Sequence, residues 1–139
     1  MDRKGHNYLC DEIMARGPRF LERLTEQESE LVIKARGNVR YGFREFNEAR
    51  DHRDAWRGVT KDSFYYSKLH YLWQTAEENF TRALKALKEL SESTIDDGVR
   101  AEALRSIRRI DSMRGRVKEA ASLVGKVRTS EVTPQRRYL

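Results

Sequence analysis

Apolar residues between Thr60 and Ser93 recur at alternating intervals of three and four positions. This spacing is sustained over more than three heptads, which predicts one long helix with a coiled-coil-like seam. A helix of that length spans about 50 Å. The seam consists of Tyr66, Leu69, Trp73, Ala76, Phe80, Ala83, Leu87 and Leu90. Leu72, Leu84 and Ala86 widen the apolar stripe, so the helix needs packing partners on two sides.

A second apolar stripe precedes this central helix and predicts a helix near residues 19–57. Pro18 suits its first position. The pair Gly37-Asn38 interrupts the pattern, but the apolar spacing resumes at Val39, so we expect one helix that kinks and continues. A connection of two or three residues then leads to Thr60, and so short a link makes the two helices antiparallel.

A third stripe follows the polar segment SESTIDDG and predicts a helix near residues 97–128. Ser93, Asp96 and Asp97 are candidate capping residues at this turn. The seam consists of Val99, Ala103, Ser106, Ile110, Met113, Val117, Ala120, Val124 and Val127. These small and β-branched residues complement the large rings of the central helix.

The predicted fold is therefore all-α, an elongated antiparallel three-helix bundle with heptad seams and a short N-terminal helix. We assign residues 1–17 to an N-terminal arm or short helix, 18–128 to the bundle and 129–139 to a flexible basic tail. A chain of 139 residues with 38% apolar and 36% charged residues suits one helical domain.

The sequence contains no apolar run near the length of a membrane span and no signal peptide behind Met1. We therefore expect a soluble protein without membrane contact, located in the cytoplasm, or in the virion or host cytoplasm if it is viral. Cys10 is the single cysteine, which fits a reducing compartment.

Motifs for catalysis, metals and cofactors are missing from the sequence. The histidines His6, His52 and His70 lie on different segments, and the pair Glu48 and His52 sits in a charge-dense run that we expect to be a solvated face. No glycine pattern matches a phosphate-binding loop. We therefore predict a non-catalytic protein with no metal site and no cofactor.

Positive charge concentrates in the last third of the chain. The net charge is +6, and residues 99–139 hold 11 Lys and Arg against 4 Asp and Glu, whereas residues 1–98 hold 17 against 18. Arginine forks suit phosphate oxygens, so we predict a nucleic-acid-binding surface here. The candidate residues are Arg105, Arg108, Arg109, Arg116, Lys118, Arg136 and Arg137. The alternative is that these residues only form the solvated side of a helix.

The wide apolar stripe of the central helix also predicts self-association or a protein partner. The candidate interface residues are Tyr66, Leu69, Trp73, Phe80 and Leu87. We expect a homo-oligomer or a subunit of a larger assembly.

Two segments of the chain carry a resemblance to a known family. Trp56 precedes a turn and a Thr-x-Asp helix start in VTKDSFYYSKLHYLW, and the chain closes with EVTPQRRYL. Over about the last two thirds of its length the chain resembles the small subunits of phage terminases. These are helical DNA-packaging factors that assemble into rings and deliver viral DNA to a motor subunit, and the resemblance implies the same role here. Residues 1–57 show no helix-turn-helix, the element with which many such proteins read DNA.

Two function classes follow from the sequence. One is an assembly factor that binds DNA or RNA through the basic last helix, and the other is a purely protein-binding scaffold component of a large complex such as a virion. The two classes differ in whether the arginines of the last helix are accessible to an anion.

Overall fold

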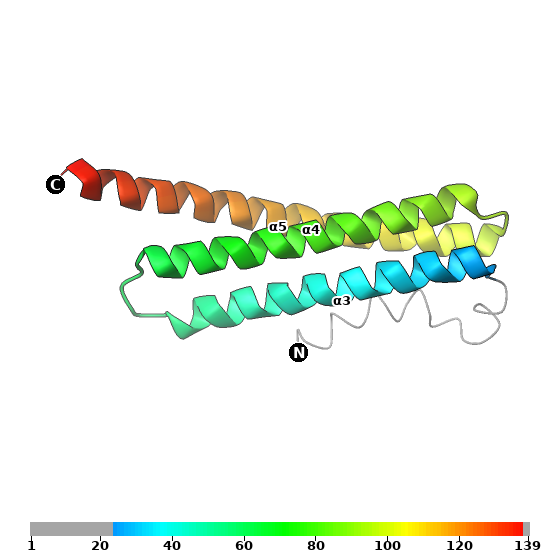
Figure 1. Cartoon of the computed structure of the whole chain (residues 1–139), viewed down its shortest axis with the longest axis horizontal. Helices are drawn as coiled ribbons and strands as arrows, with labels where there is room; N and C mark the ends of the chain where they lie inside the picture. Colours follow the sequence, from blue (N-terminus) through cyan, green and yellow to red (C-terminus); the bar gives the residue numbers. More distant parts are fainter. Residues whose placement is uncertain (1–23, 138–139) are drawn as a thin grey trace.

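A computed structural model of the chain describes the backbone of residues 24–137 and the side chains of residues 24–127. Within that part the chain forms three long helices, α3 (Glu26–Ala55), α4 (Ser63–Ser93) and α5 (Asp97–Arg137). Figure 1 shows that successive helices are antiparallel and that α4 packs against both of the others. The predicted all-α antiparallel bundle is confirmed. The predicted N-terminal arm at 1–17 lies outside the described residues.

Helix α3 begins later than its apolar pattern predicts. Thr25 has extended backbone angles (φ −69°, ψ 167°) and is the N-cap, so the expected start near residue 19 is wrong. The backbone N–H of Glu28 donates to Thr25 Oγ1, and the N–H of Thr25 donates to Glu28 Oε1, both at 3.1 Å. This capping box satisfies two donors that the first turn of a helix leaves without partners, which fixes the start at Glu26.

Gly37 and Asn38 do not end α3, which is continuous from Glu26 to Ala55. Asn38 donates to the carbonyl of Lys34 at 3.0 Å. Further along, Gly42 lies against the fully buried Phe80 of α4, and a Cβ at this position would be 2.7 Å from the Phe80 ring. Gly42 thus lets the two helices approach closely.

The connection between α3 and α4 comprises residues 56–62 and is longer than the two or three residues predicted. Gly58 adopts φ 76°, a left-handed conformation that glycine tolerates best. Asp62 is the N-cap of α4 and accepts from the N–H of Tyr65 at 3.0 Å. The buried His52 places Nε2 3.1 Å from the Tyr65 carbonyl, which holds the end of α3 against the start of α4.

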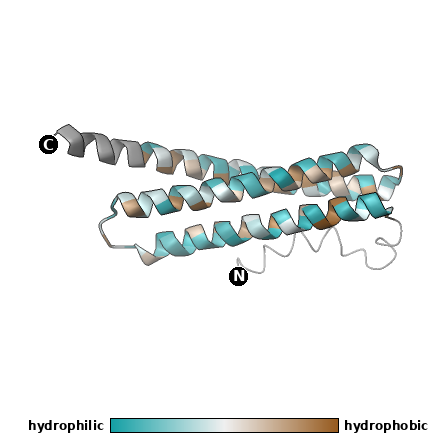
Figure 2. Ribbon diagram, viewed as in Figure 1, coloured by the Kyte–Doolittle hydropathy of each residue, from teal (hydrophilic) through white to brown (hydrophobic). Residues whose placement is uncertain are grey.

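The seam of α4 forms the centre of the bundle, as predicted, with one shift at its first turn. Tyr65 is buried and Tyr66 only half-buried, because Tyr65 stacks on His52 at a centroid distance of 5.0 Å. Figure 2 shows apolar residues recurring along each helix between hydrophilic ones. The buried apolar residues of α4 are Tyr65, Leu69, Leu72, Trp73, Ala76, Phe80, Ala83, Ala86, Leu87 and Leu90.

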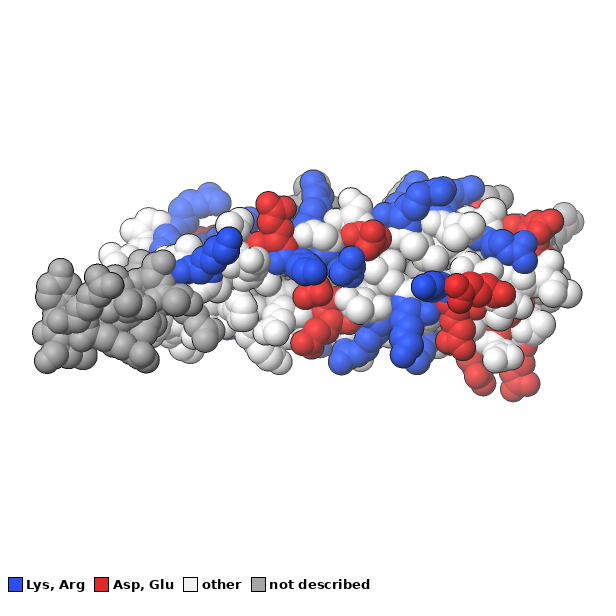
Figure 3. Space-filling model, turned by 90° about the horizontal axis from the view of Figure 1, so that it is seen from above, with Lys and Arg blue, Asp and Glu red and all other residues white. Residues whose placement is uncertain are grey.

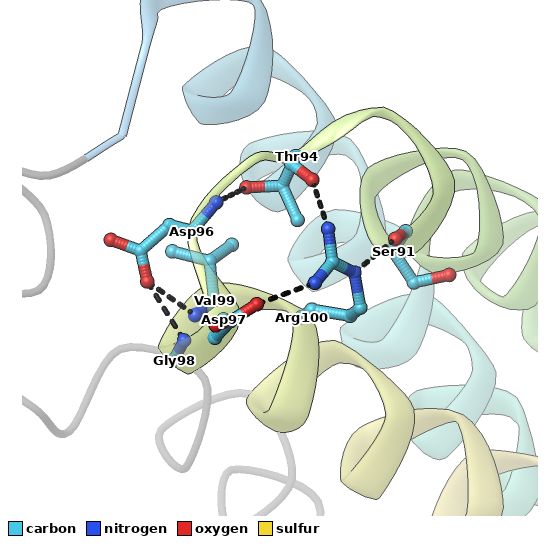
Figure 4. Close-up of polar contacts among 7 residues, drawn as sticks. All are labelled: Ser91, Thr94, Asp96, Asp97, Gly98, Val99 and Arg100. Atoms are coloured by element: carbon cyan, nitrogen blue, oxygen red, sulfur yellow. Dashed lines mark hydrogen bonds and ion pairs between the residues drawn. The ribbon is translucent and has the colours of Figure 1, made fainter.

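A network of polar contacts closes the turn between α4 and α5 (Figure 4). Asp96 Oδ1 accepts from the N–H groups of Gly98 at 2.8 Å and Val99 at 3.0 Å, which confirms Asp96 as a capping residue. The Arg100 guanidinium donates to the carbonyls of Thr94 at 2.6 Å and Ser91 at 3.3 Å. One arginine of α5 thereby satisfies carbonyl groups that the end of α4 leaves without helical partners.

Helix α5 buries Val99, Ala103, Ser106, Ile110 and Val117 of its predicted seam. It continues to Arg137, so the prediction that the helix ends near residue 128 is wrong. Extension of an existing helix gains one hydrogen bond for each added residue, and no glycine or proline interrupts the chain between residues 126 and 133. The last turn of α5 includes Pro134, which has no backbone N–H to donate.

Candidate nucleic-acid interface

An open pocket of about 280 Å³ lies where all three helices meet. Residues of α3, α4 and α5 line it: Phe46, Arg50, Arg53, Trp73, Arg116 and Ala120. Because α3 and α5 are both antiparallel to α4, they run in the same direction, and the pocket places residues 46–53 of α3 level with residues 116–120 of α5. The packing of the three helices thus brings arginines of α3 and α5 to the same pocket.

The inner wall of the pocket is aromatic. The Phe46 and Trp73 rings meet edge to face with centroids 5.4 Å apart, and Phe46 also contacts Phe43 at 6.1 Å. Trp73 is buried and Phe46 is half-buried. These contacts fix the orientation of Phe46 and leave part of its ring to the pocket.

Three guanidinium groups surround this aromatic wall, and none of the described residues that line the pocket is acidic. The Arg50 guanidinium lies 5.6 Å from the centre of the Phe46 ring, a cation–π contact. Arg53 is exposed and lies 3.9 Å from the exposed carboxylate of Asp54, a contact that holds it weakly. Arg116 is exposed and its Nη1 is 4.0 Å from Met113 Sδ. The pocket therefore has a positive local charge and attracts anions.

Arg50 and Arg53 were not among the predicted site residues. They follow Phe46 at spacings of four and three and lie beside Ala49 and His52, the positions at which the buried face of α3 continues. The pocket itself depends on the register of three helices and has no sequence signal.

The predicted arginines of α5 occupy different environments in the structure. Arg108 and Arg116 are exposed, whereas Arg105 and Arg109 are half-buried. Helical spacing places Arg105, Arg109 and Arg116 on one side of α5, the side that faces the pocket at Arg116, while Arg108 faces outward. The four residues thus do not share one outward face.

Arg105 forms part of the bundle's internal polar contacts. Its Nη1 donates to Glu102 Oε1 at 2.7 Å, and the Glu102 side chain is only 4% exposed. A buried carboxylate needs such a partner, because desolvation penalises its charged form. Arg105 is therefore held by a structural ion pair and is less available to a ligand than Arg108 or Arg116.

Lys118 is exposed and lies on the side of α5 opposite Arg116. The side chains of Arg136 and Arg137 lie outside the described residues. Figure 3 shows Lys and Arg spread among acidic residues over one face of the molecule. The positive charge is thus not a continuous stripe on that face.

Four of the five predicted interface residues are covered by the chain itself. Leu69, Trp73, Phe80 and Leu87 are buried between the helices, and Tyr66 is half-buried. The four buried residues offer no free surface to a second chain, so the prediction of an intermolecular interface is wrong for them. The reason is that α3 and α5 already cover both sides of the wide stripe of α4.

His52 was expected on a solvated face but is 9% exposed. It stacks on Tyr65 and lies near Trp56, and its ring nitrogen meets the Tyr65 carbonyl.

Among residues 24–127, no three His, Cys, Asp or Glu side chains gather in a group that would hold a metal ion. In the described part of the chain, no helix combines the length and apolarity needed to cross a membrane.

Partial burial raises the pKa of the Glu45 carboxyl, with Arg44 and a hydrogen bond from Asn79 opposing the effect. Asn79 Nδ2 donates to Glu45 Oε1 at 2.9 Å and links α4 to α3. Burial also raises the pKa of the Tyr65 hydroxyl. The titration of Glu45 is easier to follow in a stability measurement than that of Tyr65, because the ordinary pKa of a glutamate lies in the mildly acidic range.

Comparison with known proteins adds no relative: no family model, no curated protein and no solved structure matches this chain. The resemblance to small terminase subunits therefore stays a prediction.

Proposed function

We propose that this protein is a non-catalytic helical assembly factor that binds nucleic acid through Arg108 and Arg116 of α5 and through Arg50 and Arg53 of α3. The observation that carries the proposal is the pocket, where Arg116 of α5 joins Arg50 and Arg53 of α3 around an aromatic wall. Guanidinium groups bind phosphate oxygens through paired donors, and aromatic rings contact bases or sugars. A role in DNA packaging, which the terminase resemblance implies, is a narrower form of the same proposal.

The separated positions of the exposed arginines favour a nucleic acid over an acidic protein as the partner. Phosphates along a nucleic acid repeat at regular intervals, and binding them releases counterions, so even separated arginines contribute to affinity. Arg108 and Arg116 are exposed about two turns apart on α5 and meet this requirement. Arg105 does not, because its guanidinium holds Glu102.

The test is a salt titration of binding to labelled single-stranded and duplex DNA by the parent protein and by the R108Q/R116Q variant. We expect the variant to bind more weakly and to reduce the salt slope by about two phosphate contacts. The matched control is K85Q/K88Q, which removes the same charge from exposed positions on α4. A parent that binds neither probe at low salt, or two variants with equal losses, would overturn the proposal.

A purely protein-binding scaffold is the second candidate. Phe64 and Tyr71 are 65% and 63% exposed and lie one heptad apart on the same side of α4. Exposed aromatic residues on one helix face favour a protein contact. If F64S/Y71S shifts the oligomeric state measured by light scattering while the parent fails to bind nucleic acid, the scaffold function replaces the first candidate.

A further inference from the structure

The size and lining of the pocket between the helices limit what it can hold. Its volume of about 280 Å³ lies just below the usual range for ligand pockets of about 300–1,000 Å³, so it takes no more than one ring system with an attached phosphate. Its wall consists of side chains from all three helices, so the hollow is formed by the bundle rather than by one loop.

The charged and apolar parts of the pocket lie next to each other. Arg50 is positioned over the Phe46 ring at 5.6 Å, and Arg53 and Arg116 approach from two different helices. A ligand that fills the pocket thus meets guanidinium groups and an aromatic ring at once. Within one nucleotide, the phosphate and the base have this same arrangement of an anion beside a flat apolar ring.

A duplex is unable to use the aromatic wall. Its bases are stacked inside the helix and its convex outer surface presents phosphates and sugars, so it can reach the arginines but has no free base to place against Phe46. A single strand has unstacked bases that turn outward and insert into a hollow.

We infer that this pocket accepts one nucleotide of a single-stranded nucleic acid, with its base against Phe46 and its phosphate among Arg50, Arg53 and Arg116. The inference rests on the proposed function and narrows it. The protein then prefers single strands over duplexes, and the preference originates in the pocket, while the remaining basic residues bind both forms through charge.

Ala120 offers a test that leaves every charge in place. It lines the pocket from α5 and is half-buried, so the A120L substitution fills the hollow without removing an arginine. A101L is the matched control, since Ala101 is an exposed alanine of the same helix and does not line the pocket. Circular dichroism verifies that both variants keep the helical content of the parent.

The measurement is the affinity of each protein for labelled oligothymidylate and for a duplex with the same number of phosphates. The parent should bind the single strand about tenfold more tightly than the duplex, the effect of one base contact. A120L should lose this tenfold preference and keep the duplex affinity and its salt slope, and A101L should match the parent.

A second variant, F46L, separates the aromatic contact from simple filling of the pocket. Leucine keeps an apolar side chain but removes the ring, so F46L should also lose most of the single-strand preference. If the parent binds both probes equally, or if A120L keeps the preference, the inference is wrong while the proposed function stands. If the parent binds neither probe, both fail.

Discussion

Gly42 provides a direct test of how α3 packs on α4. A Cβ built at this position lies 2.7 Å from Phe80 Cε1 and 2.8 Å from Phe80 Cδ1, closer than carbon atoms approach without displacement. Phe80 is fully buried at the centre of the bundle and meets Phe43 edge to face at 5.1 Å, so its ring has little room to move. We therefore expect the G42A substitution to strain the core.

The magnitude follows from two opposing effects. Alanine favours the helix over glycine by about 1 kcal/mol, and overpacking a core position costs about 1–3 kcal/mol. G42A should thus lower the free energy of unfolding by about 0–2 kcal/mol. The matched control is G37A in the same helix, where a Cβ meets nothing within 4 Å and only the gain in helix propensity remains.

The assay is urea unfolding monitored by circular dichroism. The difference in the free energy of unfolding between G37A and G42A isolates the packing effect and should be about 1–3 kcal/mol, with G42A the less stable. An F80L background should relieve most of this difference, because the smaller side chain vacates the space that the new Cβ needs. Equal stabilities of G37A and G42A would refute the close approach of α3 to Phe80.

Four further predictions test other contacts by the same unfolding assay. T25A should cost about 1 kcal/mol, since it removes the cap of α3, and full stability would contradict the observed cap. R100A should cost about 1–3 kcal/mol, because the carbonyls at the end of α4 lose a charged donor; R100K should restore little of the loss, as lysine lacks the fork. R105Q should cost about 1–3 kcal/mol and R108Q close to nothing, because Arg105 pairs with the buried Glu102 whereas Arg108 is exposed; equal effects would remove the distinction between them. The raised pKa of Glu45 means that the folded state retains this proton more readily than the unfolded state, so its contribution to stability falls as pH rises from the ordinary pKa of 4.5 through the folded value. E45Q should flatten the stability profile over that window and keep the contact with Asn79, and an unchanged profile would contradict the effect of burial.

The helical bundle was predictable because each helix carries a long heptad pattern. On α4, Leu69, Phe80 and Leu90 all occupy the seam that their spacing indicates, and all are buried. The exceptions occur where local contacts override the pattern. The capping box between Thr25 and Glu28 begins α3 later than its apolar stripe, and stacking on His52 buries Tyr65 in place of Tyr66.

The candidate site was predictable only in part. Arg116 belonged to the predicted basic surface, but Arg50 and Arg53 did not, because their charges lie in a segment whose net charge is near zero. They become part of a site through the register between α3 and α5, which is set by the packing of both helices on α4. Composition along the chain does not contain that information.

The most direct test of the central claim is an NMR titration of the backbone amide signals with oligothymidylate. If nucleic acid binds at the pocket and at Arg108 and Arg116 of α5, the changes in chemical shift should concentrate in residues 46–53 of α3 and 108–120 of α5. Amides around Lys85 and Lys88, on the exposed side of α4, should remain unchanged. A titration that shifts no signals, or one whose changes centre on Lys85 and Lys88, would contradict the account.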